Sequence, residues 1–262
     1  MLYYILLVIQ RVINVGYKSV RFFWKIIYKL DILNEAFWLA FLSPQKMDAL
    51  TFAKYRRDKV YRRDETTRKG LFNWEKTILN QYIPKNELIT IIGAGGGRET
   101  YALLKLGYRV QAFESVPEMV TYANHFFNKE GLQVFFQLLP INTVPRVKGN
   151  VWWLGWGLYT HLFGRDNRVS FLKEVRANLL NENGLIVISY WRMGDTRKRL
   201  DSVYKVSNRL SKRKVEMGEY FRYAYWAKYF SKEEIRDEAE RAGLKVVYIN
   251  HDEYGCAVLT PQ

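Results

Sequence analysis

The chain has 262 residues, 48% of them hydrophobic and 16% aromatic, which is enough for one sizeable core and an added segment. Lysine and arginine number 41 against 26 acidic residues, and this net charge of +15 favours anionic partners such as nucleic acid, acidic lipid or a phosphorylated substrate. A single cysteine, Cys256, excludes an internal disulfide and favours a reducing compartment. The three histidines lie far apart and no CxxC occurs, so no metal site is predicted.

Residues 1–30 predict a long helix with an unusual distribution of side chains. The opening apolar run, Met1 to Ile9, is shorter than the roughly 20 residues of a membrane span and lacks the marks of a signal peptide. On a helical projection, the polar residues share one arc of roughly 100°, and the opposite side is largely apolar. They are Gln10, Arg11, Asn14, Lys18, Arg21, Lys25 and Lys29. This pattern is typical of a helix lying in the plane of a membrane; the alternative is a helix packed on its own domain with a solvated basic stripe.

The helical pattern continues toward residue 83. Ser43-Pro44 predicts a break, with Ser43 as the N-cap of a new helix and Pro44 at its first position. Residues 54–69 mix Arg, Lys and Asp with two tyrosines, which is typical of an exposed, salt-bridged helix. The alternative for this segment is a lid over a cofactor cleft. Residues 72–83 predict an amphipathic helix.

Residues 88–114 predict half of a nucleotide-binding α/β unit. Leu88 to Ile92 is an apolar, β-branched run expected to be a buried strand, and a glycine cluster follows directly. Residues 99–106 predict a helix, and 109–113 a second strand that ends on Glu114. Glycines allow a ligand to approach the backbone, and the helix N-terminus presents free N–H groups. A carboxylate at a strand tip is suited to accept hydrogen bonds from a ribose.

The glycine spacing separates two cofactor classes. A dinucleotide fingerprint, G-x-G-x-x-G, would need a glycine where Arg98 stands. Gly93, Gly95 and Gly97 instead fit G-x-G-x-G, which resembles motif I of the class I S-adenosylmethionine (SAM)-dependent methyltransferases. Glu114 lies 17 residues after Gly97, where that family keeps its ribose-binding acid. The acid that the family often has two residues before the first glycine is replaced by Ile91.

Residues 151–163 are the second informative stretch. Val151 to Leu154 predicts a central strand, and Gly155-Trp156-Gly157 follows it. Ligands of open α/β sheets lie at the carboxyl ends of the strands, so Tyr159 and His161 are expected beside the transferred group. The run GWGxYxH resembles a segment after strand 4 in a bacterial subset of the same family. His161 is suited to act as a general base, because imidazole titrates near neutral pH; the alternative is a histidine that fixes the loop.

The remaining segments complete the expected sheet. Residues 132–138 predict a third strand with no acid at its end, so an adenine would be contacted by apolar side chains or backbone. Residues 185–190 predict a fifth strand, and the basic stretch 194–215 is expected either to overhang the substrate side or to form a solvated helix. Residues 244–250 and 255–259 predict a terminal antiparallel hairpin. Such a hairpin is typical of the methyltransferase sheet and unusual in a dinucleotide-binding fold.

Together these features predict an α/β, Rossmann-like class I methyltransferase fold: a seven-stranded, mostly parallel sheet with an antiparallel last strand over residues 72–262. Residues 1–71 form a basic amphipathic helical extension. The resemblance implies SAM as the cofactor and methyl transfer to an acceptor that the sequence does not name. The catalytic residues it implies are His161 and Tyr159. The cofactor-binding residues it implies are Gly93, Ala94, Gly95, Gly97, Glu114, Ser115, Met119, Gly155 and Trp156.

Two other function classes compete with this interpretation. One is an NAD(P)-dependent oxidoreductase, against which the glycine spacing and the terminal hairpin argue. The other is a non-catalytic, membrane-surface binding module with the same fold. The expected acceptor is a small or lipid-linked molecule, since no added RNA-binding module accompanies the basic charge, and an oligomer is allowed. The expected location is the cytoplasm, with peripheral attachment to the inner face of the membrane through residues 1–30.

Overall fold

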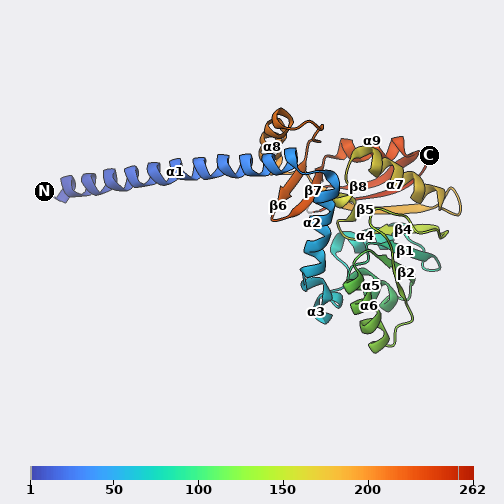
Figure 1. The fold of residues 1–262 in the computed structure, drawn as a ribbon. Helices are drawn as coiled ribbons and strands as arrows, with labels where there is room; N and C mark the ends of the chain where they lie inside the picture. The colour runs from blue at the N-terminus through green and yellow to red at the C-terminus, as the bar shows by residue number, and fades with distance from the viewer. Residues whose placement is uncertain (1, 253) are drawn as a thin grey trace.

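The computed structural model describes residues 2–252 and 254–262, with side chains described from residue 20 onward. These residues form a sheet with helices on both faces and one long helix that extends away from the body (Figure 1). The strands are β1 (Leu88–Ile92), β2 (Arg109–Glu114), β3 (Phe136–Leu138), β4 (Val151–Leu154), β5 (Leu185–Arg192), β6 (Glu219–Arg222), β7 (Tyr225–Phe230), β8 (Leu244–Asn250) and β9 (Gly255–Pro261). The helices are α1 (Leu2–Phe41), α2 (Pro44–Arg57), η1 (Val60–Arg62), α3 (Asp64–Thr67), α4 (Asn73–Tyr82), α5 (Arg98–Lys105), α6 (Pro117–Lys129), η2 (Leu158–His161), α7 (Arg165–Ala177), α8 (Arg197–Leu210) and α9 (Lys232–Arg241).

The sheet has the predicted topology. Strands β3, β2, β1, β4 and β5 lie side by side in that order and run parallel. β9 pairs antiparallel with β5, and β8 pairs antiparallel with β9, so the predicted seven-stranded sheet with a reversed last strand is confirmed. The structure adds a hairpin, β6–β7, which the sequence analysis missed. β7 continues the sheet from the end of β5, where Trp191 and Arg192 pair with it.

Side chains on the two faces of the sheet form two hydrophobic cores. On β4, Val151 and Trp153 pack into the core under α4, α5 and α6, whereas Trp152 and Leu154 pack into the core under α7 and α9. Successive side chains of a strand point to opposite faces, and a parallel sheet is covered on both. The nearly continuous apolar runs of β1 and β4 follow from this double burial.

The third strand is shorter than predicted. It was expected over residues 132–138, but ladder pairing with β2 begins only at Phe136, opposite Ala112. The side chain of Asn124 on α6 forms two hydrogen bonds with the backbone of Phe136: it accepts from the N–H at 2.8 Å and donates to the carbonyl oxygen at 3.1 Å. The residues before Phe136 belong to the connection from α6.

The N-terminal segment is helical, as predicted, and breaks where predicted. α1 ends at Phe41, and Ser43 caps α2 by accepting from the backbone N of Lys46 at 3.3 Å. Ile32, Ala36 and Leu39 are buried against α8 and the β6–β7 hairpin. The part of α1 before Asp31 leaves the body (Figure 1), and its side chains from Val20 to Leu30 are exposed. The predicted side-chain positions of Gln10, Arg11, Asn14 and Lys18 lie outside the described residues.

Charged residues anchor the end of α1. Arg199 of α8 pairs with buried Glu35 and lies 3.1 Å from Asp31, which also accepts from Arg222 of β6 at 2.8 Å. Burial raises the pKa of Glu35 to about 7, and Arg199 opposes that shift. Within the basic segment 194–215, one face of α8 packs against α1, whereas Arg197, Lys198, Lys205 and Arg209 are exposed, as expected for a solvated helix.

We predict that the exposed part of α1 contributes little to stability. A chain that begins at Asp31 should keep a free energy of unfolding within about 1 kcal/mol of the full-length value, because the side chains from Val20 to Leu30 that it loses are exposed. A chain that begins at Ser43 should lose several kcal/mol, since buried Ile32 and Leu39 contribute about 1.5–3 kcal/mol each. Urea unfolding followed by circular dichroism measures both. Equal losses in the two chains would contradict the assignment of residues 20–30 as unpacked.

Candidate active site

The glycine turn after β1 is held against the ends of two neighbouring strands. The backbone N–H groups of Gly93 and Ala94 donate to the carbonyl of Phe113 at 2.8 and 3.0 Å. A Cβ on Gly155, after β4, would lie 2.1 Å from the carbonyl oxygen of Gly93. Gly95 has φ +57°, a conformation that side chains disfavour, and its N–H points to the tip of β2. The turn thus fixes the carboxyl edges of β1, β2 and β4 relative to one another.

Glu114 sits at this junction with both carboxylate oxygens engaged. Its Oε2 accepts from the backbone N of Gly95 at 2.7 Å, and its Oε1 accepts from the backbone N of Ser115 and of Val116 at 2.8 Å each. The side chain is 6% exposed. Burial raises the pKa of Glu114, and the three N–H donors oppose that shift. The acid that the sequence predicted is therefore fixed beside the glycine turn.

A cavity of about 300 Å³ opens at this carboxyl edge. Most of the predicted cofactor residues line it: Gly93, Ala94, Gly95, Glu114, Ser115, Met119 and Trp156. Two predicted glycines do not, because each makes a close packing contact instead. A Cβ on Gly97 would lie 2.5 Å from the ring of Phe127, and Gly155 abuts the backbone of Gly93. Both glycines let neighbouring elements approach closely, and a contact of their backbone with a cofactor stays a prediction.

The N-terminal segment supplies a second wall of the cavity. Residues Asp48, Thr51, Phe52 and Tyr55 come from α2, and Tyr61, Thr66, Thr67 and Lys69 from the segment that follows. The carbonyl oxygen of Tyr61 lies so close to Gly96 that a Cβ there would be 1.8 Å away. Thr67 donates to the carbonyl of Gly96 at 3.1 Å. Residues 54–69, called the cover below, thus lie over the cavity, as the lid interpretation expected. The cavity wall therefore includes residues that precede the predicted domain boundary at residue 72.

His161 lines the cavity and is held by three groups. Its Nδ1 lies 3.1 Å from the carbonyl oxygen of Trp226, so Nδ1 carries the proton and donates. Its Nε2 lies 3.0 Å from the hydroxyls of both Tyr55 and Tyr225, which are the available donors. Burial lowers the pKa of His161 to about 4. The imidazole is therefore neutral at pH 7, with its lone pair directed at Tyr55 and Tyr225.

Tyr159 does not line the cavity, which corrects its prediction as a residue beside the transferred group. Residues 158–161 form a 3-10 helix, in which side chains three apart share a face. Leu158 and His161 therefore face the cavity, whereas the buried Tyr159 points away and its hydroxyl donates to Glu238 at 2.6 Å.

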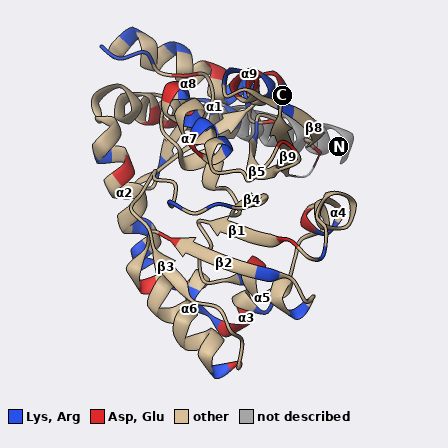
Figure 2. Cartoon of the chain, turned by 90° about the vertical axis from the view of Figure 1, so that its right-hand side faces the viewer, with Lys and Arg blue, Asp and Glu red and all other residues tan. Residues whose placement is uncertain are grey.

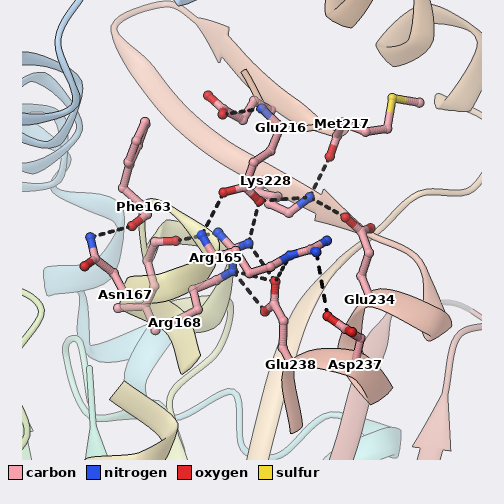
Figure 3. Close-up of polar contacts among 12 residues, drawn as sticks. Phe163, Arg165, Asn167, Arg168, Glu216, Met217, Lys228, Glu234, Asp237 and Glu238 are labelled. Atoms are coloured by element: carbon pink, nitrogen blue, oxygen red, sulfur yellow. Dashed lines mark hydrogen bonds and ion pairs between the residues drawn. The ribbon is translucent and has the colours of Figure 1, made fainter. Parts of the chain in front are cut away.

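Glu238 belongs to a buried charge cluster that joins α7, α9 and the β6–β7 region (Figure 3). Fully buried Arg168 donates to Glu238 at 2.7 Å and to Glu216 at 2.6 Å. Lys228 donates to Glu234 at 2.8 Å. Buried charges require such partners, so the cluster holds the added hairpin on the core.

A second buried charge cluster lies behind the glycine turn. Arg98 donates to both carboxylate oxygens of Glu75, at 2.7 and 2.6 Å, and to Glu99 at 2.8 Å. Glu99 lines the cavity and also accepts from the backbone N of Trp156 at 3.2 Å. It thereby connects the first turn of α5 to the segment after β4.

Sequence reasoning missed several cavity residues. Glu99 stands two residues after Gly97, the last glycine of the motif. Its place in the motif was therefore a local signal for a cavity residue. Asp48, Tyr55 and Tyr61 carry no local signal, because only the folding of α2 and η1 over the sheet edge brings them there. Within residues 20–252 and 254–262, no group of three or more His, Cys, Asp or Glu side chains is arranged to hold a metal ion.

The strand order, the reversed last strand and the glycine turn after β1 define the Rossmann-like fold of class I SAM-dependent methyltransferases. No protein-family model and no curated protein matches the sequence. Among solved structures, the chain is similar to a SAM-dependent methyltransferase from Methanosarcina mazei, with a TM-score of 0.61 and 15% identity over 73% of this chain and 98% of that one. It is also similar to the CcbJ methyltransferase from Streptomyces caelestis, with a TM-score of 0.55 and 16% identity over 71% of this chain and 88% of that one.

A third similar structure carries ligands. It is the 1,6-didemethyltoxoflavin-N1-methyltransferase from Burkholderia thailandensis, solved with 1,6-didemethyltoxoflavin and S-adenosylhomocysteine bound. The TM-score is 0.58 and the identity 17%, over 84% of this chain and 91% of that one. Similarity at this level of identity establishes the fold of the chain.

The lowered pKa of His161 predicts a pH dependence of stability. An unfolded histidine titrates near 6.5, whereas His161 in the fold titrates near 4, so the unfolded state binds more protons between these values. Its contribution to stability is complete above about pH 6.5 and falls with pH down to about 4, by up to about 3 kcal/mol. His161→Asn should therefore flatten the pH profile of urea unfolding in this window. His125→Asn is the control, and parallel profiles for His161→Asn and the wild type would contradict the burial argument.

Proposed function

We propose that the chain is a SAM-dependent methyltransferase. The observation that carries the proposal is the convergence of the glycine turn, Glu114 and the segment after β4 on one cavity at the carboxyl edge of the sheet. A cofactor with its methionine part at Gly93–Gly95 and its ribose at Glu114 would have its sulfonium near Trp156 and Leu158. SAM supplies the methyl group, and the chain contributes position and orientation.

The cofactor contacts follow from the donors and acceptors present. Oε2 of Glu114 accepts from Gly95 alone, so it keeps a lone pair for a ribose hydroxyl. Glu99 offers a carboxylate for the methionine ammonium, a role that Ile91 cannot fill. Lys69 lines the same region from the cover and offers a cation for the methionine carboxylate.

The cavity favours an uncharged acceptor. Its lining cations are Lys69 and Arg98, and two carboxylates hold Arg98. Phe52, Leu162 and Phe171 give the cavity an apolar wall. An apolar molecule with a hydroxyl or amine nucleophile fits this lining better than a phosphorylated one. In the view of Figure 2, Asp and Glu lie among Lys and Arg on the outer helices, although α8 carries five basic residues and one acid.

Tyr55 and His161 are the proposed acceptor contacts. Tyr55 lines the cavity and can donate its hydroxyl proton to Nε2 of His161. Its oxygen would then accept a hydrogen bond from the attacking hydroxyl or amine and orient that group toward the methyl; the proton of the attacking group would be released to water after the transfer. Because the pKa of His161 is only about 4, we assign it to orienting Tyr55 rather than to removing the proton completely.

We expect Glu114→Ala to weaken SAM binding by about 1.5–3 kcal/mol, because a hydrogen bond to a charged group is lost. Isothermal calorimetry with SAM, S-adenosylhomocysteine and NAD measures this, and NAD should not bind. Glu114→Gln, which keeps the shape of the side chain, should weaken binding in the same direction. Glu174→Ala, at an exposed acid of α7, is the control. Unchanged SAM affinity in a folded Glu114→Ala variant would exclude the ribose assignment.

We further propose that α1 docks the enzyme on an anionic membrane surface, where the acceptor would be encountered. Its exposed side chains include a run of large apolar residues: Val20, Phe22, Phe23, Trp24, Ile26, Ile27, Tyr28 and Leu30. Arg21, Lys25 and Lys29 are exposed at four-residue spacing, so they share one face of the helix. The helices within the described residues are all too short or too polar to cross a membrane. An apolar helix with a basic stripe instead suits the interface between headgroups and acyl chains.

The docking proposal predicts binding to acidic vesicles. The full-length chain should float with phosphatidylserine-containing liposomes at low salt and much less with phosphatidylcholine alone. Replacing Arg21, Lys25 and Lys29 by Gln should weaken binding by about 1 kcal/mol per residue, and salt should weaken the wild type in the same way. The matched control replaces exposed Lys105, Lys173 and Lys245, which lie on the globular body. No flotation, or equal loss in the control, would contradict a docking role for α1.

A further inference from the structure

Asp48 has few hydrogen-bond partners among the described residues. It lies half-buried on α2 and lines the cavity. Among the described residues, its one recorded hydrogen bond comes from Nδ2 of Asn142 at 3.4 Å, a long contact, and it forms no ion pair. Burial raises the pKa of Asp48 to about 6, and the Asn142 contact opposes that shift. A carboxylate removed from water is costly without hydrogen-bond donors, so this one has capacity for a ligand donor.

The neighbours of Asp48 place it at the adenosine end of the cavity. Asn142 belongs to the loop after β3, and this loop begins beside Glu114, because the backbone N of Leu139 donates to the carbonyl of Glu114 at 2.9 Å. Asn142 has φ +58°, which asparagine tolerates, and it lines the cavity together with Leu139. Met119 forms part of the same lining. A base attached to a ribose on Glu114 would therefore lie among apolar side chains with Asp48 and Asn142 within the same cavity.

We propose that Asp48 accepts a hydrogen bond from the 6-amino group of the cofactor's adenine and that Asn142 donates to the neighbouring ring nitrogen. The pairing edge of adenine presents an amino donor beside a ring-nitrogen acceptor. A carboxylate accepts from the first, and an amide N–H donates to the second. Strand β3 ends at Leu138 and is followed by Leu139 and Pro140, so no acid stands at its end. Asp48 on α2 would supply the carboxylate from outside the sheet. This inference rests on the proposed function.

The test compares two cofactor analogues that differ at this edge of the base. S-inosylhomocysteine carries a carbonyl oxygen where S-adenosylhomocysteine carries the amino group, and its neighbouring ring nitrogen carries a proton. The oxygen would face the Asp48 carboxylate, and the ring N–H would face the amide N–H of Asn142. The full-length wild type should bind the adenosyl compound about 10- to 100-fold more tightly in calorimetry, as expected for one hydrogen bond to a charged group. In Asp48→Asn the ratio should fall, because the new amide can donate to the carbonyl as well as accept from the amine. Asp166→Asn, at an exposed position on α7, should keep the wild-type ratio.

The outcomes separate this proposal from the one on which it rests. Failure of the wild type to bind S-adenosylhomocysteine would overturn the proposed function and the role of Asp48 with it. Binding of both analogues with equal affinity by the wild type would overturn the adenine contact alone, whatever the variant does. An unchanged preference in a folded Asp48→Asn variant would also overturn it. A lower preference in Asp48→Asn, with the control unchanged, supports the contact.

Discussion

The buried carboxylate of Glu114 fixes the geometry on which the site depends. It joins the glycine turn to the tip of β2 through the backbone N–H groups of Gly95, Ser115 and Val116. A buried charge is tolerated only when such donors surround it, so the turn and the strand tip are held in one arrangement before any ligand arrives. A site formed in advance loses less free energy to ordering when it binds.

The cover over this site, residues 54–69, is not held by a buried charge of this kind. Arg56–Glu118 and Arg68–Glu130 tie the cover to α6, but both arginines are exposed and their glutamates are only half-buried, and pairs near the surface contribute little. The tight contact is the carbonyl of Tyr61 against Gly96, with the Thr67 hydroxyl beside it. Close contact with the glycine turn, rather than strong ion pairs, therefore holds the cover in place.

The sequence predicted those parts of the site whose determinants are local. Strand, glycine turn, helix and acid follow one another within residues 88–114, so spacing alone located Gly95 and Glu114. The Ser43-Pro44 break and the terminal hairpin were found for the same reason. Tyr159 was misplaced because a 3-10 turn, rather than an open loop, decides which side chains face the cavity. Asp48 and Tyr55 were missed because their position depends on packing between α2 and elements far along the chain, such as His161 and Asn142.

The positive charge of the chain lies largely outside the cavity, because only Lys69 and Arg98 of its 41 lysine and arginine residues line the wall. The charge of +15 suggested a phosphorylated or nucleic-acid substrate, yet the cation nearest the glycine turn, Arg98, is neutralised by Glu75 and Glu99. Under the proposed function, basic residues act at the surface that docks the enzyme, and the cavity selects an apolar acceptor. α1 ends at Phe41 and α2, which forms the cavity wall, begins at Pro44. A membrane-bound α1 would therefore keep the cavity wall close to the interface, so that an apolar acceptor could move from lipid to Tyr55 with little exposure to water.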